Sequence, residues 1–298
     1  MTRIGSYDLI ESLGKGPHGP AHLGVEPIAG RTAVIKLLES LARSDADLDE
    51  LLAPAFSINS EWIAKTLGVG RHEGVPFIVR EYTHGLDLEG LRRATRPFER
   101  GLALGLLVAT ARALETFHAA SFPHGNLRLS NLLVTRSGEL HLADPAVFAR
   151  LFPNALSALA SGRLGSVPVL SPARHRGEPP CPADDVYALG AIGHWLLADA
   201  WPFAASELDR LAREKQDRAP ADLPADVTPG LRDVLRSALA PTPEGRPSTV
   251  TELRRALEAV SKQRGEDPED TLADGLSSLG LAFITGRGSD RSARPAAP

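Results

Sequence analysis

The chain has little cysteine and no apolar run of membrane-spanning length. Its one cysteine, Cys181, excludes an internal disulfide framework and a cysteine-ligated zinc cluster, and it fits a reducing compartment. The most apolar stretch, 101–111, ends at Arg112 and is too short to cross a bilayer. The residues after Met1 show no apolar segment of the signal-peptide type. These absences predict a cytoplasmic protein without a membrane span.

Neither sign of charge dominates the sequence. The 298 residues include 33 Lys and Arg against 37 Asp and Glu, a formal net charge of −4, and no long block of one sign. Strongly basic surfaces attract nucleic acids and anionic membranes. We therefore expect neither a nucleic acid nor a membrane as partner.

A β-rich first part precedes a helix-rich second part. Alternating apolar residues predict strands at 7–13, 21–25, 32–38 and 77–79. One helix is expected between them, at roughly 45–56, and others at 101–120, 185–198 and 248–260, the last opened by Ser248. This order predicts an α+β fold with a β-rich lobe over 1–82, a helical lobe over 83–262 and a cleft between them. Residues 263–298 are expected to form a disordered tail, although 276–284 could dock.

A glycine-rich segment separates the first two expected strands. It reads GKGPHGPA over 14–21 and contains Gly14, Gly16 and Gly19. Glycines at this spacing let backbone amides approach phosphate groups closely, although a simple hairpin turn has the same composition. Lys36 follows the apolar residues 33–35, and a lysine on an inward-facing strand needs an anionic partner. The alternative is a surface lysine whose stem lies along the strand.

Several later segments are more specific. Residues 124–134 read HGNLRLSNLLV, and LHLAD follows at 140–144. SPARHRGEP, DVYALG, WPF and GRPS follow at 171–179, 185–190, 201–203 and 245–248. In order and spacing these segments resemble a protein kinase of the bacterial Ser/Thr type, over about residues 7–260. The resemblance implies a bilobal kinase-like fold.

The resemblance also implies a nucleotide site. Lys36 would hold the α- and β-phosphates of ATP, while Asn131 and Asp144 would coordinate the Mg²⁺ that bridges them. Asp185 would accept hydrogen bonds from the backbone of the catalytic loop, which is a structural duty.

The adenine pocket shows paired substitutions. A kinase usually has valine and alanine where this chain has Ala21 and Val34, a swap that roughly preserves volume. The swap indicates either a pocket still filled by a flat apolar group or neutral drift in an emptied one. Arg80 stands where an apolar residue usually lies at the back of the pocket; it could pair with Glu50 or Glu81, or obstruct the pocket. Glu81 is expected to contribute to the nucleotide site.

The catalytic loop departs from the family pattern. Asn126 stands where a kinase has the aspartate that orients the substrate hydroxyl and accepts its proton. An amide cannot accept that proton at neutral pH, although its oxygen could still hold the hydroxyl. Arg128 replaces the usual lysine, keeping the charge but changing its reach.

Other departures affect structural pairs. Pro145 and Ala146 replace the aromatic residue and glycine that usually follow the metal-binding aspartate. Ala173 replaces the glutamate that usually pairs with Arg246, so Glu178 or another acid is expected to substitute.

The glutamate that should pair with Lys36 is displaced. Leu51 occupies its expected position, and Glu50 is one residue away, which is about 100° around a helix. Pro54 lies in the same helix and should bend or shorten it, so that Glu50 could still reach Lys36.

Three functions remain open. The sequence favours a pseudokinase that binds ATP and Mg²⁺ and acts in signalling through a protein partner, because the nucleotide contacts are present and Asn126 replaces the catalytic aspartate. The alternatives are an active Ser/Thr kinase with a protein substrate and a kinase-fold scaffold that binds no nucleotide. The partner or substrate is unknown.

Overall fold

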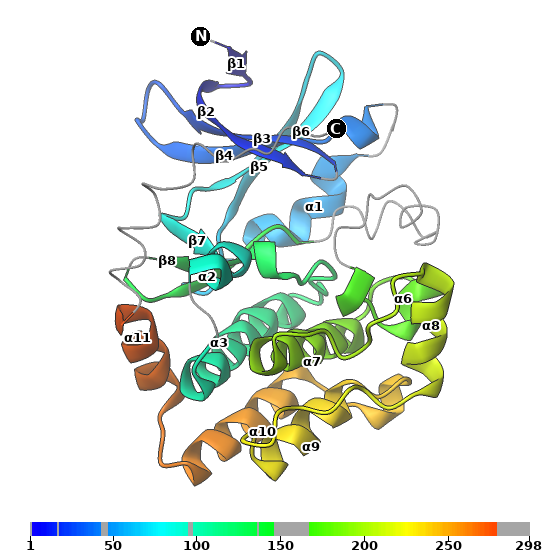
Figure 1. The fold of residues 1–298 in the computed structure, drawn as a ribbon. Coiled ribbons are helices and arrows are strands. Elements are labelled where there is room, and N and C mark those ends of the chain that lie inside the picture. Colours follow the sequence, from blue (N-terminus) through cyan, green and yellow to red (C-terminus); the bar gives the residue numbers. More distant parts are fainter. Residues whose placement is uncertain are drawn as a thin grey trace, which may run out of the picture.

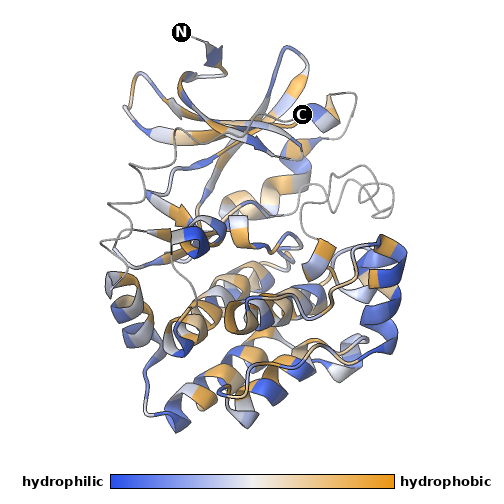
Figure 2. Ribbon diagram, viewed as in Figure 1, coloured by the Kyte–Doolittle hydropathy of each residue, from blue (hydrophilic) through white to orange (hydrophobic). Residues whose placement is uncertain are grey.

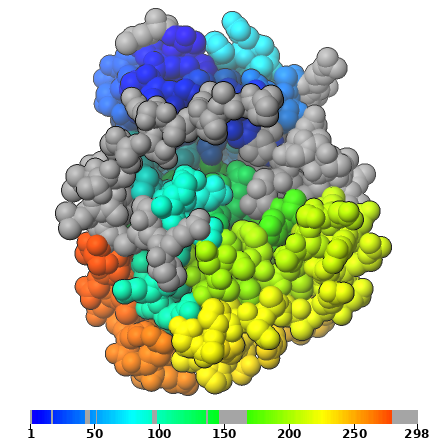
Figure 3. Space-filling model, viewed as in Figure 1, coloured from blue at the N-terminus to red at the C-terminus, as the bar shows by residue number. Residues whose placement is uncertain are grey.

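The computed structural model describes residues 2–16, 18–42, 47–94, 98–135, 137–145 and 167–278. A β-sheet lobe, coloured blue to cyan, lies at one end of the molecule and a helical lobe, green to orange, at the other (Figures 1 and 3). The division agrees with the predicted α+β, bilobal architecture.

The first lobe is a six-stranded antiparallel sheet in the order β1-β2-β3-β4-β6-β5. The strands are β1 (Arg3–Ile4), β2 (Tyr7–Gly16), β3 (Gly19–Val25), β4 (Thr32–Leu37), β5 (Thr66–His72) and β6 (Val75–Glu81). Side chains alternate across β6: Phe77 and Val79 pack with Ile35 in the small core of this lobe. Ile78 and Arg80 lie on the opposite face, which lines the cleft.

Helix α1 (Leu48–Ser57) begins later than expected. The Asp47 side chain caps it by accepting from the backbone N–H groups of Asp49 and Glu50. Pro54 lies inside the helix, where it lacks the N–H that would bond the Glu50 carbonyl. The helix continues past Pro54 to Ser57, one residue beyond the expected end, so Pro54 does not shorten it; its 10 residues reflect the later start.

The second lobe is built around one buried helix, α3 (Arg100–Ala119). A small sheet, β7 (Gly85–Asp87), β8 (Leu132–Thr135) and β9 (Leu140–Leu142), joins it to the first lobe. The other helices are α2 (Leu88–Ala94), α6 (Pro172–His175), α7 (Pro182–Ala198), α8 (Leu208–Asp217), α9 (Pro229–Ala238), α10 (Val250–Gln263) and α11 (Pro268–Ser278). Hydrophobic residues concentrate on α3 and α7, whereas α8 is largely hydrophilic (Figure 2).

The length and composition of α3 would suffice to cross a membrane, contrary to the expectation from its shorter apolar stretch. In the structure 72% of its most apolar window is buried inside the protein. Its apolar character is therefore explained by its position in the core, since α7, α10 and α11 all pack against it.

The cap of α10 differs from the expectation. Thr249, not Ser248, is the N-cap residue, and its hydroxyl accepts from the Glu252 backbone N–H. Ser248 instead donates its backbone N–H and its hydroxyl to the Glu252 carboxylate. The pair forms a capping interaction shifted by one residue.

The expected disordered tail is wrong for its first part. Residues 268–278 form α11, which packs against α3 with Leu272 and Leu276 buried. The approach is close because a Cβ on Gly105 would lie 2.7 Å from the Pro268 carbonyl oxygen. A short apolar face matched to glycines on a neighbouring helix has too weak a sequence signal to be recognised. Residues 279–298 lie outside the described part of the chain.

A buried lysine attaches α8 to the chain around residue 168. Lys215 Nζ donates to the carbonyl oxygens of Val167, Pro168 and Leu170 at 2.7–3.0 Å and lies 3.1 Å from His175 Nε2. The side chain is fully buried, and its four hydrogen-bond partners are three carbonyls and an imidazole. Burial lowers the pKa of Lys215 to about 7.

The lowered pKa of Lys215 predicts a pH-dependent stability. The unfolded chain keeps this lysine protonated up to its ordinary pKa of 10.5, whereas the folded chain loses the proton near pH 7. Stability from this group therefore rises with pH, by about 2 kcal/mol between about pH 7 and about pH 9. Lys215→Met should lack this increment in urea unfolding at the two pH values, while Lys262→Met, at an exposed lysine, should keep it. Equal pH slopes in wild type and Lys215→Met would contradict the assignment.

Candidate active site

A cavity of about 680 Å³ lies between the two lobes. Its volume is that of a typical small-molecule site. Nearly all the residues that the sequence predicted for a nucleotide site line it: Gly14, Gly16, Gly19, Ala21, Val34, Lys36, Asn126, Arg128, Asn131 and Asp144. Residues more than 100 positions apart in the chain thus meet in one cleft.

The cavity has apolar walls from both lobes. Leu13, Ala21, Val34 and Ile78 come from the six-stranded sheet, and Leu133 comes from β8. Ala21 and Val34 therefore lie where the resemblance placed them, and together these residues can enclose a flat apolar ring. Leu133, which the sequence analysis missed, is itself buried, as are all four residues of β8, so the apolar run LLV carried no signal that could have marked it.

Glu81 does not line the cavity, contrary to the prediction. It is an exposed residue at the end of β6, and its backbone carbonyl accepts from Arg80 Nη1 at 3.0 Å. The reason is strand alternation, because Arg80 faces the cleft and its neighbour must face away. Tyr82 and Thr83, the next residues along the chain, line the cavity instead.

The glycine-rich segment forms the ends of β2 and β3. Gly14 and Gly19 have φ angles of 116° and 146°, a region that favours glycine. A side chain at Gly19 would also clash, since its Cβ would lie 2.4 Å from the Leu37 carbonyl oxygen. Backbone amides can therefore come close to the cavity here. Pro17 lies outside the described residues.

One carboxylate faces two cations across the cleft. Lys36 Nζ forms an ion pair and a hydrogen bond with Asp144 Oδ2. Arg80 Nε lies 3.3 Å from Asp144 Oδ1, and the two side chains are 12% and 14% exposed. Both oxygens of Asp144 are therefore engaged by positive charge from the sheet lobe.

The expected partners of these cations were wrong. Glu50 is exposed on α1 and pairs with neither Lys36 nor Arg80 in the described structure. Leu52 is the α1 residue that lines the cavity. The helix thus presents an apolar side chain toward Lys36, and Asp144 supplies the missing negative charge.

The charges shift the pKa values of the group. Burial alone would raise the pKa of the Asp144 carboxyl, but Lys36, Arg80 and Arg128 outweigh it and hold that pKa well below its usual range. Burial lowers the pKa of Lys36, with Asp144 opposing the shift and Arg80 adding to it. Burial likewise lowers the pKa of Arg128. The surrounding cations therefore favour the ionised form of Asp144.

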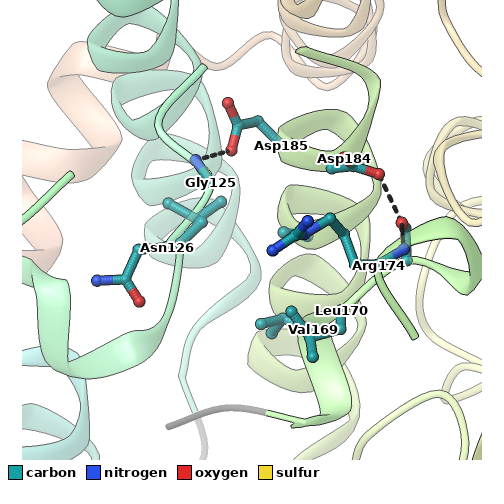
Figure 4. A pocket seen from close by; sticks show the side chains of 10 residues that line it. Gly125, Asn126, Val169, Leu170, Arg174, Asp184 and Asp185 are labelled. Carbon is teal, nitrogen blue, oxygen red and sulfur yellow. Dashed lines mark hydrogen bonds between the residues drawn. The ribbon is translucent and has the colours of Figure 1, made fainter. Parts of the chain in front are cut away.

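The catalytic loop is held by Asp185, as predicted. Its Oδ1 accepts from the Gly125 backbone N–H at 2.7 Å (Figure 4). Its Oδ2 accepts from the His124 backbone N–H at 2.8 Å. Gly125 has a φ of 65°, which glycine adopts without strain. His124 is fully buried and donates its Nε2–H to the Ala143 carbonyl. These bonds fix the backbone on which Asn126 stands.

Asn126 uses its amide nitrogen to hold the chain at Asp144. Asn126 Nδ2 donates to the Asp144 backbone carbonyl at 2.9 Å. Asn131 Nδ2 donates to the backbone carbonyl of Asn126 at 2.8 Å. A carbonyl oxygen only accepts, so the atom that faces it must be the amide nitrogen. The bond also supports Asp144 in its left-handed backbone conformation, with φ of 57°. A carboxylate at position 126 could not make this bond.

The residues present do not fit the expected divalent cation. Asn131 Oδ1 is buried without a hydrogen-bond partner, as a metal ligand would be. However, Asp144, the one expected anionic ligand, has both oxygens engaged by Lys36 and Arg80. Within the described residues no group of three or more His, Cys, Asp or Glu side chains could hold a metal ion. One neutral amide oxygen is a weak site for Mg²⁺, which prefers carboxylates and phosphates.

Glu178 does not pair with Arg246, and the other acid that the prediction allowed is Asp184, next to several backbone carbonyls. The Arg246 guanidinium donates to the carbonyl oxygens of Ala183, Ala240 and Pro241 at 2.8–2.9 Å and lies 4.0 Å from Asp184 Oδ1. Glu178 is bound to Arg176 instead. Backbone carbonyls thus compensate for Ala173, which stands where the glutamate was expected. Ala146 lies outside the described residues.

The sequence resembles known protein kinases along most of its length. Residues 7–259 match the family model described as "Protein kinase domain". Serine/threonine-protein kinase PknA of Mycobacterium tuberculosis is 27% identical over 273 residues, which cover 89% of this chain and 63% of PknA. Serine/threonine-protein kinase PknB of Mycolicibacterium smegmatis is 26% identical over 280 residues, covering 90% of this chain and 45% of PknB. The chain thus spans less than two thirds of the length of either relative.

The contact between Asn126 and Asp144 predicts a cost for restoring an acid. In Asn126→Asp a carboxylate oxygen would face the Asp144 carbonyl, and we expect the free energy of unfolding at neutral pH to fall by about 1–3 kcal/mol. Asn126→Ala removes the bond without adding repulsion and should be less destabilised. Chemical denaturation of the three proteins measures this order. If Asn126→Asp were as stable as the wild type, the Asn126 side-chain amide would not be holding the backbone at Asp144.

Proposed function

The chain belongs to the protein kinase domain family, and on that premise we propose that it is a catalytically impaired member, a pseudokinase. It binds ATP in the cleft between its lobes and acts in signalling through a protein partner. The observation that carries the proposal is the hydrogen bond from Asn126 Nδ2 to the Asp144 carbonyl. The residue at the catalytic position thus has a structural role, because its side chain holds the backbone at Asp144.

Loss of transfer follows from the chemistry at Asn126. Phosphoryl transfer to a hydroxyl depends on positioning the nucleophile and on a group that takes its proton. A neutral amide does not take that proton at neutral pH, and here its nitrogen is committed to the Asp144 carbonyl. The carboxylate of Asp144 is in turn committed to Lys36 and Arg80. Neither group is free for the role that a kinase gives it.

Retention of nucleotide is supported by the cavity itself. Kinases of this family normally use ATP with Mg²⁺. The cleft combines apolar walls with a positively charged end formed by Lys36, Arg80 and Arg128. Arg128 Nε is buried without a hydrogen-bond partner, and such an unsatisfied donor suits an anionic ligand. A scaffold that binds no ligand would leave this buried donor unsatisfied.

An active Ser/Thr kinase is the second candidate. It is favoured by the meeting of Lys36, Asn131 and Asp144 in one cleft and by the names of the relatives, which are serine/threonine-protein kinases. In that case the Asn126 amide oxygen would hold the hydroxyl without accepting its proton.

Binding of ATP can be tested at Lys36. We expect isothermal titration calorimetry to show ATP binding to the wild type, and Lys36→Ala to weaken it by about tenfold or more, because a charge-assisted contact to phosphate is lost. Lys262→Ala changes an exposed lysine on α10 and should bind as the wild type does. Absence of any heat from ATP in the wild type would favour the scaffold.

Phosphate transfer separates the two kinase-like functions. With radiolabelled ATP and a generic protein substrate, we expect wild-type incorporation to be no greater than that of Lys36→Ala, because no group accepts the proton of the hydroxyl. The assay should follow label both in the substrate and in the chain itself. Incorporation by the wild type that Lys36→Ala abolishes would establish an active kinase and overturn the pseudokinase proposal.

A further inference from the structure

Arg80 occupies the position at Asp144 where charge compensation would otherwise come from a metal ion. It projects from β6 on the face shared with Ile78, opposite Val34 of β4, so the strand register aims it into the cleft. Its Nε lies 3.3 Å from Asp144 Oδ1. Its Nη1 donates to the Glu81 carbonyl, which anchors the guanidinium at the back of the cavity.

A divalent cation at Asp144 would meet strong repulsion. Lys36, Arg80 and Arg128 are all close enough to act on the Asp144 carboxylate. A metal ion would have to displace Lys36 or Arg80 from a carboxylate oxygen and remain beside the displaced charge.

The same arrangement favours a polyphosphate. Arg128 Nε is buried and makes no hydrogen bond in the described structure, and Arg80, whose Nε is ion-paired with Asp144, lines the same cavity. A guanidinium binds phosphate oxygens in a planar, forked geometry that an ammonium cannot reproduce. Two such groups with Lys36 supply positive charge at one end of the cleft, and Arg128 adds an unsatisfied donor.

We propose that Arg80 takes the place of the divalent cation, so that this cleft binds the phosphates of a nucleoside triphosphate without metal. The assignment rests on the proposed function in one respect, that the cleft binds a nucleotide. It identifies Arg80 as the residue that makes nucleotide binding independent of metal. Asp144 then binds the side chains of Lys36 and Arg80 instead of a metal ion.

Calorimetry with ATP tests the metal dependence. Wild-type affinity measured in EDTA and in excess MgCl₂ should differ by less than about threefold, whereas Arg80→Met should bind ATP about tenfold or more tightly with Mg²⁺ than without it. Arg80→Gln, which removes the charge but keeps a polar side chain, should show the same dependence of ATP affinity on Mg²⁺. It is the variant to use if Arg80→Met folds poorly. Arg71→Met, at an exposed arginine of β5, serves as the matched control and should behave as the wild type. A wild type that needs Mg²⁺ for ATP binding would overturn the proposal.

A second measurement needs no nucleotide. Titration with Mn²⁺, followed by the electron paramagnetic resonance signal of the free ion, should show an Mn²⁺ site in Arg80→Met that is at least about tenfold weaker in the wild type. The site should disappear in the double variant Arg80→Met with Asp144→Asn. If ATP binds under neither condition but this Mn²⁺ site appears, the nucleotide function fails and the assignment of Arg80 stands. Equal Mn²⁺ binding by wild type and Arg80→Met overturns the assignment, whatever ATP does.

Discussion

The arrangement of the cleft depends on the charge of Asp144. Lys36 and Arg80 extend from two neighbouring strands of the sheet lobe, and the carboxylate that they share belongs to the segment after β9 in the other lobe. A partly buried charge without a partner is costly, so removal of the Asp144 carboxylate would leave both cations without their partner. The contact therefore ties the lobes together at the point where ligand must enter. It also explains why Asp144 keeps a left-handed backbone, since the Asn126 amide supports its carbonyl while the cations hold its side chain.

Helix α1 provides no carboxylate for Lys36. A helix that presented a carboxylate to Lys36 would free Asp144, but Glu50 faces solvent and Leu52 faces the cavity. Asp144 consequently forms the ion pair with Lys36, and Arg80 is a second cation at the same carboxylate. The altered helix, the arginine on β6 and the asparagine in the catalytic loop thus have one common consequence. Each of them changes the charge in the cleft around Asp144.

Local pattern and family resemblance predicted much of this structure, and non-local contacts account for most of the errors. The apolar residues of α3 and α7 and the strand that carries Lys36 were found because burial imposes a pattern on consecutive residues. Strand alternation was also available for β6, and it would have excluded Glu81 from the cleft in which Arg80 was already placed. The partner of Arg80 could not be found, because Asp144 is 64 positions away and only the folded chain brings the two together. The same holds for Arg246, whose partners are mostly backbone carbonyls, which no residue type reveals.

The two main departures from the kinase pattern are related through charge. Relative to a site that binds Mg²⁺, Arg80 would replace a doubly charged ion by a singly charged side chain, and so removes one positive charge. Asn126, in place of aspartate, removes one negative charge from the same cleft. The two changes cancel, so the cleft offers a phosphate chain about the same net charge with or without them. An aspartate at 126 beside Arg80 would instead compete with Asp144 for the cations and reduce the attraction for an anion. Arginine on β6 and asparagine in the catalytic loop are therefore compatible with each other, and each makes the other less costly.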